Sequence, residues 1–383
     1  MAFFCGWDFV LRWCRLPPRS QRREDALFSS GFPMKCIPGN RYRQKAISGV
    51  ITSAYLERMQ QKLLLLILML GAMVLVALYA VARGAYDVPL KEVFLALTGS
   101  ADPTAGVVIT NIRMPRVIAA MVCGWGLSLS GLSIQSLLKN PLGAPSTLGI
   151  SQGAAFGAAA AIVFFGAEMF SVTAFAFGGA MAATLVILVL SGLKRLSPEA
   201  VILAGVALSS LFVSATILIQ YLATETQLAM VVFWTFGDVA RSNWREIGLL
   251  AGAVFFASLY LTAISWDINA LASGEETAKG LGVNVERIRV TGMVAAALVS
   301  AMATAFHGVI AFIGLIAPHM GRRLVGDDHR LLIPFSSVLG ALLLLTADTL
   351  GRMLIGSGAL PVGVITSFLG APMFLYLLVR GYR

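Results

Sequence analysis

The residues that could do chemistry in this sequence are few and scattered. Of the three histidines, His307 stands alone in an apolar stretch, and His319 and His329 flank Asp327 and Asp328. These four side chains could supply metal ligands, but their spacing fits no zinc pattern, and GDDHR is typical of a solvated turn. The phosphate loop G-x-x-x-x-G-K-[ST] and the patterns H-E-x-x-H and G-x-S-x-G are absent. We therefore expect no catalytic residue and no metal site in this chain.

One carboxylate, Asp348, falls inside an apolar segment. Carboxyl groups within membrane helices often belong to proton or ion relays. An ion-coupled secondary transporter would need several such groups, and an intramembrane enzyme would need paired Ser/His or Asp residues at depth. Because Asp348 lies near the end of its segment, we expect it to make a helix-terminal hydrogen bond.

The longest polar stretch between apolar segments is Asp267–Arg287, which contains SGEETAKGLGVNVER. Ser273, followed three residues later by Glu276, forms a capping box that predicts a helix start. Gly280 and Gly282 favour its end. The result is a helix of about two turns, roughly 12 Å long and too short to span a bilayer. It could dock a cytoplasmic partner or be a solvated loop helix, and the residues alone do not decide.

These stretches are set in an apolar chain. The 383 residues are 58% hydrophobic and 13% charged, whereas soluble domains are about 25% charged. A span needs roughly 20 apolar residues, so we expect an all-α polytopic membrane protein of about ten spans. Nine also fit, because the eighth apolar segment is short. The segments lie near 63–82, 115–137, 148–167, 171–193, 199–222, 246–266, 288–311, 312–325, 331–350 and 361–380.

The basic residues predict the orientation. Most of the 29 Lys and Arg residues fall on the side of the N-terminus, and Lys and Arg stay on the cytoplasmic side. Both termini are therefore expected in the cytoplasm. The net charge of +10 follows from this bias and does not indicate nucleic-acid binding, which would add aromatic residues to a basic groove.

The stretch KNPLGAPSTLGISQGAAFG interrupts the apolar pattern. Pro141 and Pro145 exclude a regular helix there, and irregular backbone at membrane depth must be shielded by protein or line a cavity. Gly149, Gly153 and Gly157 recur every four residues, so on a helix they would share one closely packed face.

A second interruption, IGLIAPH with Pro318, lies in the other half of the chain. Paired interrupted segments suggest an inverted internal repeat with the transport path at its interface.

Residues 1–58 differ from the rest, being basic and rich in proline. We expect a disordered extension, with a permease-like domain at 59–383 and Met59 as the true start. A regulatory or targeting tail is the alternative. The four cysteines form no CxxC pair, which favours a reducing compartment.

Over residues 59–383 the sequence resembles the permease subunits of type II ABC importers (FecCD-like) for iron–siderophore, haem and cobalamin compounds. Several independent motifs carry the resemblance. They are RMPRVIAAM (113–121), SGLSIQSLLKNPLGAPSTLGISQGA (130–154), GEETAKGLGV (274–283), AFIGLIAPHMGRRLVGDDHRLLIP (311–334) and ADTLGRMLIGSGALPVGVITSFLGAPMFLYLL (347–378).

The resemblance implies a non-enzymatic subunit of the bacterial inner membrane, with ten helices and a dimeric partner, either a second copy or a homologue. A separate cytoplasmic ATPase would hold ATP and magnesium, so this chain would bind no cofactor. A periplasmic or lipid-anchored binding protein would deliver the cargo, most often a ferric siderophore, with haem and cobalamin as alternatives.

The resemblance also implies roles for individual residues. The loop helix would be a coupling helix resting on the ATPase, which favours docking over a solvated loop. Outward-facing arginines would meet the binding protein, and serines would line the pathway. The coupling residues are Ser273, Gly274, Glu275, Glu276, Ala278, Leu281 and Gly282; the docking residues are Arg113, Arg116 and Arg352; the pathway residues are Ser209, Ser210 and Ser214. We expect the first interruption to pack near the inner side of that pathway.

Overall fold

The computed structural model describes five stretches of the chain, in which helices and turns are present and strands are not. The chain divides into two compact units, residues 1–65 and 66–383, which we describe separately. The described stretches are 41–83, 89–97, 102–192, 197–354 and 360–379. Their helices are α3 (Arg41–Ala82), α4 (Leu90–Leu97), α5 (Pro103–Val107), η1 (Val108–Arg113), α6 (Met114–Leu137), α7 (Ile150–Ala160), η2 (Ala161–Phe165), α8 (Met169–Gly192), α9 (Pro198–Leu222), α10 (Glu225–Thr235), η3 (Val239–Arg241), α11 (Trp244–Ala263), α12 (Ser265–Ala272), α13 (Glu275–Gly280), α14 (Val285–His307), α15 (Ile313–Val325), α16 (His329–Leu354) and α17 (Val362–Val379).

The first unit contributes one described element, the N-terminal part of α3, which begins at Arg41. Residues 41–58, which fall within the extension expected to be disordered, are helical in this structure. Residues 1–40 lie outside the described residues.

Seven described helices are long and apolar enough to cross a membrane, and two shorter apolar helices accompany them. The bounds of α8 and α9 agree with the segments expected at 171–193 and 199–222 to within a few residues. α15 has only 13 residues, short of the roughly 20 that a span needs. Ten spans and an inverted repeat therefore remain predictions.

Capping side chains set where several of these helices begin. Ser197 accepts a hydrogen bond from the backbone of Ala200 at the start of α9, and Asn284 does the same for Arg287 at the start of α14. Each cap satisfies a backbone N–H that has no partner within the helix.

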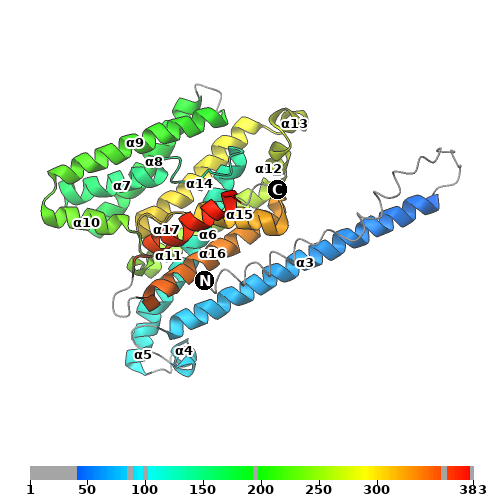
Figure 1. The fold of residues 1–383 in the computed structure, drawn as a ribbon. Coiled ribbons are helices and arrows are strands. Elements are labelled where there is room, and N and C mark those ends of the chain that lie inside the picture. Colours follow the sequence, from blue (N-terminus) through cyan, green and yellow to red (C-terminus); the bar gives the residue numbers. More distant parts are fainter. Residues whose placement is uncertain (1–40, 84–88, 98–101, 193–196, 355–359, 380–383) are drawn as a thin grey trace. The chain divides into compact units, whose positions relative to one another are not determined.

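In the second unit, α6 is the central helix, and α11, α14, α15 and α16 pack around it (Figure 1). Small residues permit this close packing. A Cβ on Gly124 would overlap the backbone of Gly340 in α16, and one on Gly131 would overlap Gly314 in α15. The hydroxyl of Ser130 donates to the carbonyl of Ala296 in α14 (2.6 Å). Small residues and interhelical hydrogen bonds of this kind hold helices together in lipid.

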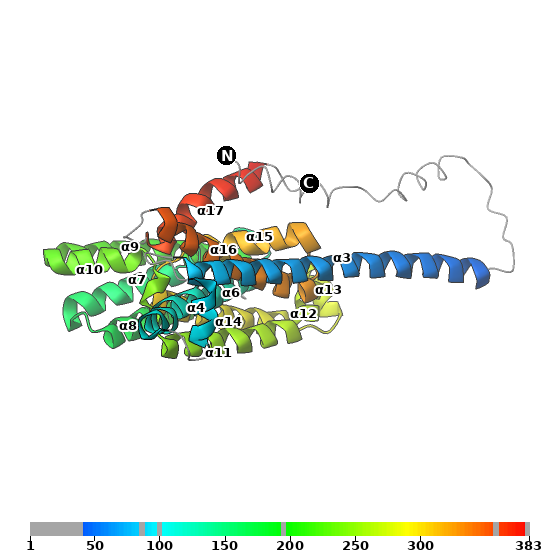
Figure 2. The same cartoon turned by 90° about the horizontal axis from the view of Figure 1, so that it is seen from below.

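A second group of helices, α7, α8 and α9, lies beside α14 (Figure 2). The structure places Gly153 and Gly157 of α7 against α8, where a Cβ on Gly157 would overlap the carbonyl of Phe175. Gly149 does not share this face. It precedes α7 as its N-cap, at φ +77°, and faces Ser209 and Gly205 of α9 instead.

The first interruption, between α6 and α7, is packed inside the protein only in part, since Leu142 and Thr147 are exposed. Pro145 and Leu148 are buried and Pro141 is partly buried. Its backbone is hydrogen-bonded locally: Gly143 N donates to Asn140 O (3.0 Å), and Ile150 N donates to Pro145 O (3.1 Å). Its buried part, around Gly143–Pro145 and Leu148, is therefore shielded by protein, as irregular backbone at membrane depth would have to be.

α6 ends in a Schellman motif in which Lys139 is the left-handed residue, at φ +47°. Asn140 N donates to Gln135 O (3.0 Å), and Lys139 N donates to Ser136 O (3.4 Å). Glycine is the usual residue at this position, because a side chain there is crowded by its own backbone.

We expect Lys139→Gly to stabilise the protein by about 1 kcal/mol, because glycine relieves the left-handed strain. The midpoint of thermal unfolding in detergent measures the effect. Lys91→Gly, an exposed lysine in α4, is the matched control and should lower stability by a similar amount, through loss of helix propensity. A lower midpoint for Lys139→Gly would contradict this reading of the helix end.

The second interruption is not at Pro318, which the structure places inside the continuous helix α15. The break lies just before α15, where Gly308 and Phe312 have positive φ angles of +76° and +68°. The expectation of a break at Pro318 is therefore wrong in position. Proline is tolerated inside membrane helices where neighbouring groups satisfy the carbonyl that it leaves without a donor.

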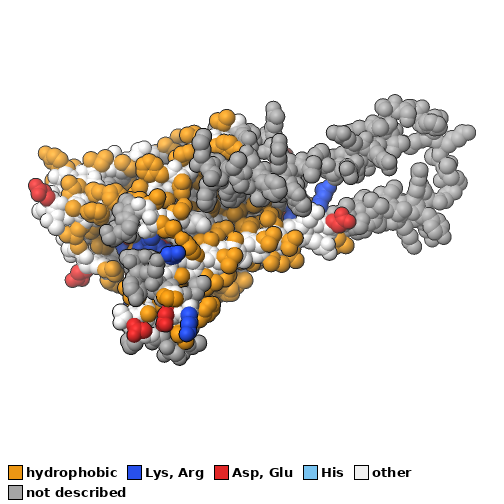
Figure 3. Space-filling model, turned by 60° about the horizontal axis from the view of Figure 1, so that its bottom comes forward, with side chains coloured by type: hydrophobic (Ala, Val, Ile, Leu, Met, Phe, Trp, Pro, Cys, Tyr) orange, Lys and Arg blue, Asp and Glu red, His pale blue; other side chains and the backbone are white. Residues whose placement is uncertain are grey.

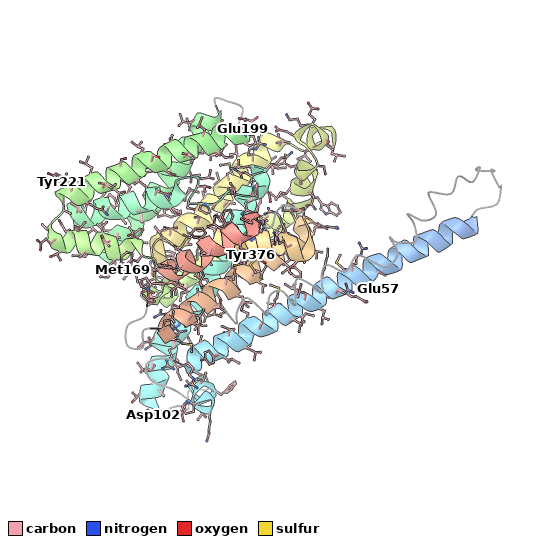
Figure 4. The ribbon with its side chains drawn as sticks, viewed as in Figure 1. Glu57, Asp102, Met169, Glu199, Tyr221 and Tyr376 are labelled. Atoms are coloured by element: carbon pink, nitrogen blue, oxygen red, sulfur yellow. The ribbon has the colours of Figure 1, made fainter. Side chains whose placement is uncertain are left out.

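Hydrophobic side chains are spread widely over the described part of the face seen in Figure 3. The helix α9 is an example: Leu203, Leu211 and Ile217 are exposed. Figure 4 labels Glu199 and Tyr221 at its opposite ends, so polar groups mark the limits of an apolar cylinder. Such a surface suits lipid or another membrane subunit better than water.

Candidate functional site

The short helices α12 and α13 lie together at one end of the bundle, where α14 begins (Figures 1 and 2). α13 starts after Gly274, whose φ of +131° reverses the chain, and no side chain caps it. The expected capping box is wrong, because the hydroxyl of Ser273 donates to Asn269 O (3.4 Å) and not to a residue of α13. Ser273 belongs to the turn that ends α12.

α13 presents a small surface of mixed character. Ala278 is buried and anchors the helix, whereas Leu281, just after it, is 70% exposed. Glu276 is also exposed, and Glu275 forms an ion pair with Lys279 (3.6 Å). Gly282, at φ +85°, turns the chain toward α14. An exposed leucine beside carboxylates is a surface that a partner protein can cover.

Beneath α13 lies Arg289 of α14, only 1% exposed. Its Nε donates to the carbonyl of Leu137 at the end of α6 (3.3 Å), and its Nη2 lies 3.5 Å from Oε2 of Glu275. This arginine therefore joins α13, α14 and the end of α6.

A second polar link joins α12 to α6. The side-chain oxygen of Asn269 in α12 accepts from His329 N (2.9 Å) and lies 2.7 Å from His329 Nδ1. The other ring nitrogen, Nε2, lies 2.6 Å from the hydroxyl of Ser136 in α6. Asn269 also donates to Asp328 (2.9 Å). Hydrogen bonds from Arg330 and Asn269 hold the pKa of the Asp328 carboxyl below its ordinary value, against the opposing effect of burial.

α15 contributes a third link to the same helix end. Arg322 donates to the side-chain oxygen of Gln135, and the amide of Gln135 donates to the carbonyl of Gly314 (3.2 Å). The last turn of α6 is thus hydrogen-bonded to α14, α15 and α16. Cationic side chains are favourable at a helix C-terminus, where carbonyl groups lack helical partners.

At the start of α6, a buried cluster surrounds Asp348 of α16, whose side chain is fully buried. Arg116 donates to it from Nε (2.9 and 3.1 Å) and from Nη2 (2.7 Å). Arg352 Nε lies 3.3 Å from the same carboxylate, and Asp238 lies 3.9 Å from Arg116. One carboxylate therefore pairs with two arginines at close range, and a second acid lies nearby.

The remaining arginine contacts close the end of α3. Arg113 Nη1 donates to the carbonyls of Val81 (2.7 Å) and Ala82 (2.9 Å), and Arg352 Nη1 donates to Ala80 O (3.0 Å). These carbonyls belong to the last turn of α3 and have no donor within the helix. The guanidinium groups of Arg113, Arg116 and Arg352 thus make contacts inside the protein, and their expected place on the outer side of the membrane stays a prediction. Whether they also contact a partner stays a prediction.

The three serines of α9 do not share a face. Ser210 and Ser214 are exposed, one helical turn apart, whereas Ser209 is half-buried beneath Gly149, where a Cβ on that glycine would lie 3.1 Å from its hydroxyl oxygen. Ser210 and Ser214 therefore lie at the surface of α9, and a pathway role for the three serines stays a prediction.

The two acids and the histidine at 327–329 take part in hydrogen bonds and ion pairs. Asp327 lies 3.4 Å from Arg322, and Asp328 lies 2.7 Å from Arg330. Within the described ranges, no group of three or more His, Cys, Asp or Glu side chains is arranged to hold a metal ion.

Sequence reasoning missed Arg289, Asn269 and Gln135, and it missed the partner of Asp348. A signal for the last was present: Arg116 lies near the start of α6 and Asp348 near the end of α16. Two antiparallel helices would bring those ends together. No local pattern marks the other three, because each partner is distant in sequence.

Comparison with known proteins shows the family to which the chain belongs. Residues 47–380 match the FecCD transport family, a match that begins before the boundary expected at Met59. A Methanocaldococcus jannaschii protein named as an ABC transporter permease is 47% identical over 85% of this chain and 96% of its own length. The hemin transport permease of Yersinia pestis is 35% identical over 84% of this chain and 97% of its own length.

A solved structure also resembles the chain. It is named as an inward-facing conformation of a metal-chelate type ABC transporter, and it superposes with a TM-score of 0.75 at 31% identity. The match covers 83% of this chain and 99% of that one. The chain therefore belongs to the FecCD transport family, as a multi-pass ABC transporter permease subunit that is not itself an enzyme.

Proposed function

We propose that this permease belongs to an ATP-driven importer of an iron chelate and moves its cargo by alternating access. Our first choice of cargo is a ferric siderophore. The names of its relatives support the cargo class: hemin, Fe(3+)-citrate and iron(3+)-hydroxamate permeases match at 33–35% identity, and a permease for cobalamin, a cobalt compound, matches at 38%. Haem and cobalamin are the alternative cargoes within this proposal. A molybdate permease matches as closely, so overall sequence identity does not identify the cargo.

The single observation that carries the proposal is the surface of α13. An exposed leucine and an exposed glutamate on a short helix outside the apolar bundle fit a cleft in a separate ATPase. Because the sequence lacks a phosphate loop, ATP and magnesium would bind to that partner, and this chain would bind no cofactor. Closure of two ATPases would then displace α13.

The rest of the assembly follows from the same proposal. A second copy or a homologous permease would cover the apolar face of α9, with Ser210 and Ser214 toward the pathway between the two subunits. The substrate-binding protein would dock at the opposite end of the bundle, near Arg113, Arg116 and Arg352. With α13 facing the ATPase, both termini would lie in the cytoplasm and the chain in the inner membrane.

Reversing the charge of Glu275 and Glu276 tests the coupling role. In vesicles containing the full complex, the double change to Lys should lower uptake per ATP hydrolysed by about tenfold, in the range of typical coupling energies. Uptake of a hydroxamate siderophore loaded with radioactive iron and release of phosphate are measured together. Glu286→Lys, an exposed acid at the start of α14, is the control and should leave the ratio unchanged. Intact transport in the double variant would refute the assignment of α13.

The same vesicles separate the cargo classes and the energy source. Ferric siderophore, haem and cobalamin are supplied in turn with the cognate binding protein. We expect uptake of one of them only when ATP is present. Uptake that persists without ATP and follows a proton gradient would instead establish an ion-coupled secondary transporter.

A further inference from the structure

Arg289 is the most deeply buried charged side chain of α14, and its contacts lie on two other helices, α6 and α13. Burying a guanidinium group is costly unless partners satisfy it. One partner is the carboxylate of Glu275 on α13, the helix that we propose contacts the ATPase. Another is the carbonyl of Leu137, the last residue of α6. Arg289 is thus the direct link between α13 and the central helix.

The end of α6 is suited to receive such a link. The Schellman motif satisfies the carbonyls of Gln135 and Ser136 through backbone N–H groups, and Arg289 supplies a donor to the carbonyl of Leu137, the next residue along. A helix C-terminus also carries partial negative charge, which attracts the cation. A displacement of Arg289 would therefore act on the end of α6 through both a hydrogen bond and charge.

From the end of α6, close backbone packing leads on to α9. The interruption that follows Leu137 ends at Leu148 and Gly149, which lie against α9. A Cβ on Gly205 would be 3.0 Å from Cα of Leu148, and one on Gly149 would be 3.1 Å from the hydroxyl of Ser209. Contacts this close leave little space to absorb a movement, since packed interiors transmit strain.

We propose that Arg289 is a positioning residue that carries displacement of α13 to the end of α6, and from there through the interruption to α9. The inference rests on the proposed function, in which the ATPase displaces α13. It goes further by naming the side chain and the route by which that displacement reaches the helix assigned to the pathway.

The test follows α9 directly and needs no cargo. The permease is assembled with its ATPase in vesicles, with Cys5, Cys14 and Cys36 replaced by Ser and Ser214 replaced by Cys. Cys123 is buried and stays in place. The rate at which a maleimide modifies the new cysteine is measured with and without ATP and vanadate. We expect ATP to change this rate in the otherwise unaltered chain.

Arg289→Lys retains the charge but cannot reach both partners, so we expect it to reduce that ATP-dependent change by about fivefold or more. ATP hydrolysis and assembly with the ATPase should persist, which distinguishes lost positioning from misfolding. Arg287→Lys, an exposed arginine two residues earlier, is the matched control and should behave as the parent chain.

Glu275→Ala provides a second variant that breaks the same link from its exposed end. If both residues act on one route, the double variant should lose no more than the more severe single variant. If the combined variant reduced the ATP-dependent change by the product of the two single effects, Arg289 and Glu275 would act independently, and the proposal would be overturned.

Failure of this inference is distinguishable from failure of the proposed function. If the Glu275 and Glu276 charge reversal uncouples the complex but Arg289→Lys leaves the ATP-dependent reactivity unchanged, only the route through Arg289 is wrong. If the charge reversal itself has no effect, the role of α13 is wrong, and the inference falls with it.

Discussion

Asp348→Asn should destabilise the permease by about 3 kcal/mol or more, because the loss of a buried charge partner leaves uncompensated cations in a dry site. Asp348 is fully buried and accepts three hydrogen bonds from Arg116, and Arg352 lies 3.3 Å away. Asparagine has nearly the same shape, so the change removes charge with little change in packing. The midpoint of thermal unfolding in detergent is the measurement.

Asp327→Asn is the matched control for this change. Asp327 also pairs with an arginine, at 3.4 Å, but its side chain is 77% exposed. Exposed ion pairs contribute about 0 to 1 kcal/mol, so this variant should be close to the parent in stability. Equal losses for the two aspartates would contradict a special role for the buried one.

A compensating change sharpens the same prediction. In the Asp348→Asn background, Arg352→Met removes one of the two cations that lost their partner, so part of the stability should return. Replacing buried ions with apolar groups of similar volume is often tolerated. A further loss equal to that of Arg352→Met alone would show that the two sites act independently.

The bounds of a helix could be predicted from the sequence where capping residues flank a long apolar run. α9 is such a case: Ser197 and Pro198 begin it, and its apolar composition needs no knowledge of the neighbours. The bounds of α15 were harder to predict. Proline usually interrupts a helix, and whether Pro318 is tolerated inside one depends on the helices around it. Gly149 was misplaced for a related reason, since spacing by four does not reveal where a helix starts.

The sites were predictable only as far as local patterns reach. The loop sequence indicated a short helix, and the family resemblance indicated its role, but neither showed Arg289 beneath it. Arg116 and Asp348 are separated by 232 positions, and their pairing is a property of how two helices pack. A charged residue considered alone in a membrane sequence is therefore expected to be exposed. The fold can instead bring two oppositely charged side chains together in the protein interior.

Gly131→Ala should be as damaging as the loss of Asp348, at about 3 kcal/mol, because overpacking a tight helix contact forces the backbone to move. A Cβ on Gly131 of α6 would overlap the backbone carbonyl of Gly314 at the start of α15. That carbonyl accepts from the amide of Gln135, so the displacement would also disturb the hydrogen bonds at the end of α6. No flexible side chain is available to absorb the clash, since the overlapping atoms are backbone.

Gly252→Ala in α11 separates this clash from the general effect of adding a methyl group. A Cβ on Gly252 meets nothing within 4 Å, so alanine there should preserve or slightly raise stability through helix propensity. Thermal midpoints of the two variants in the same detergent give the comparison. If Gly131→Ala unfolds at the parent midpoint, then α6 and α15 are not in backbone contact.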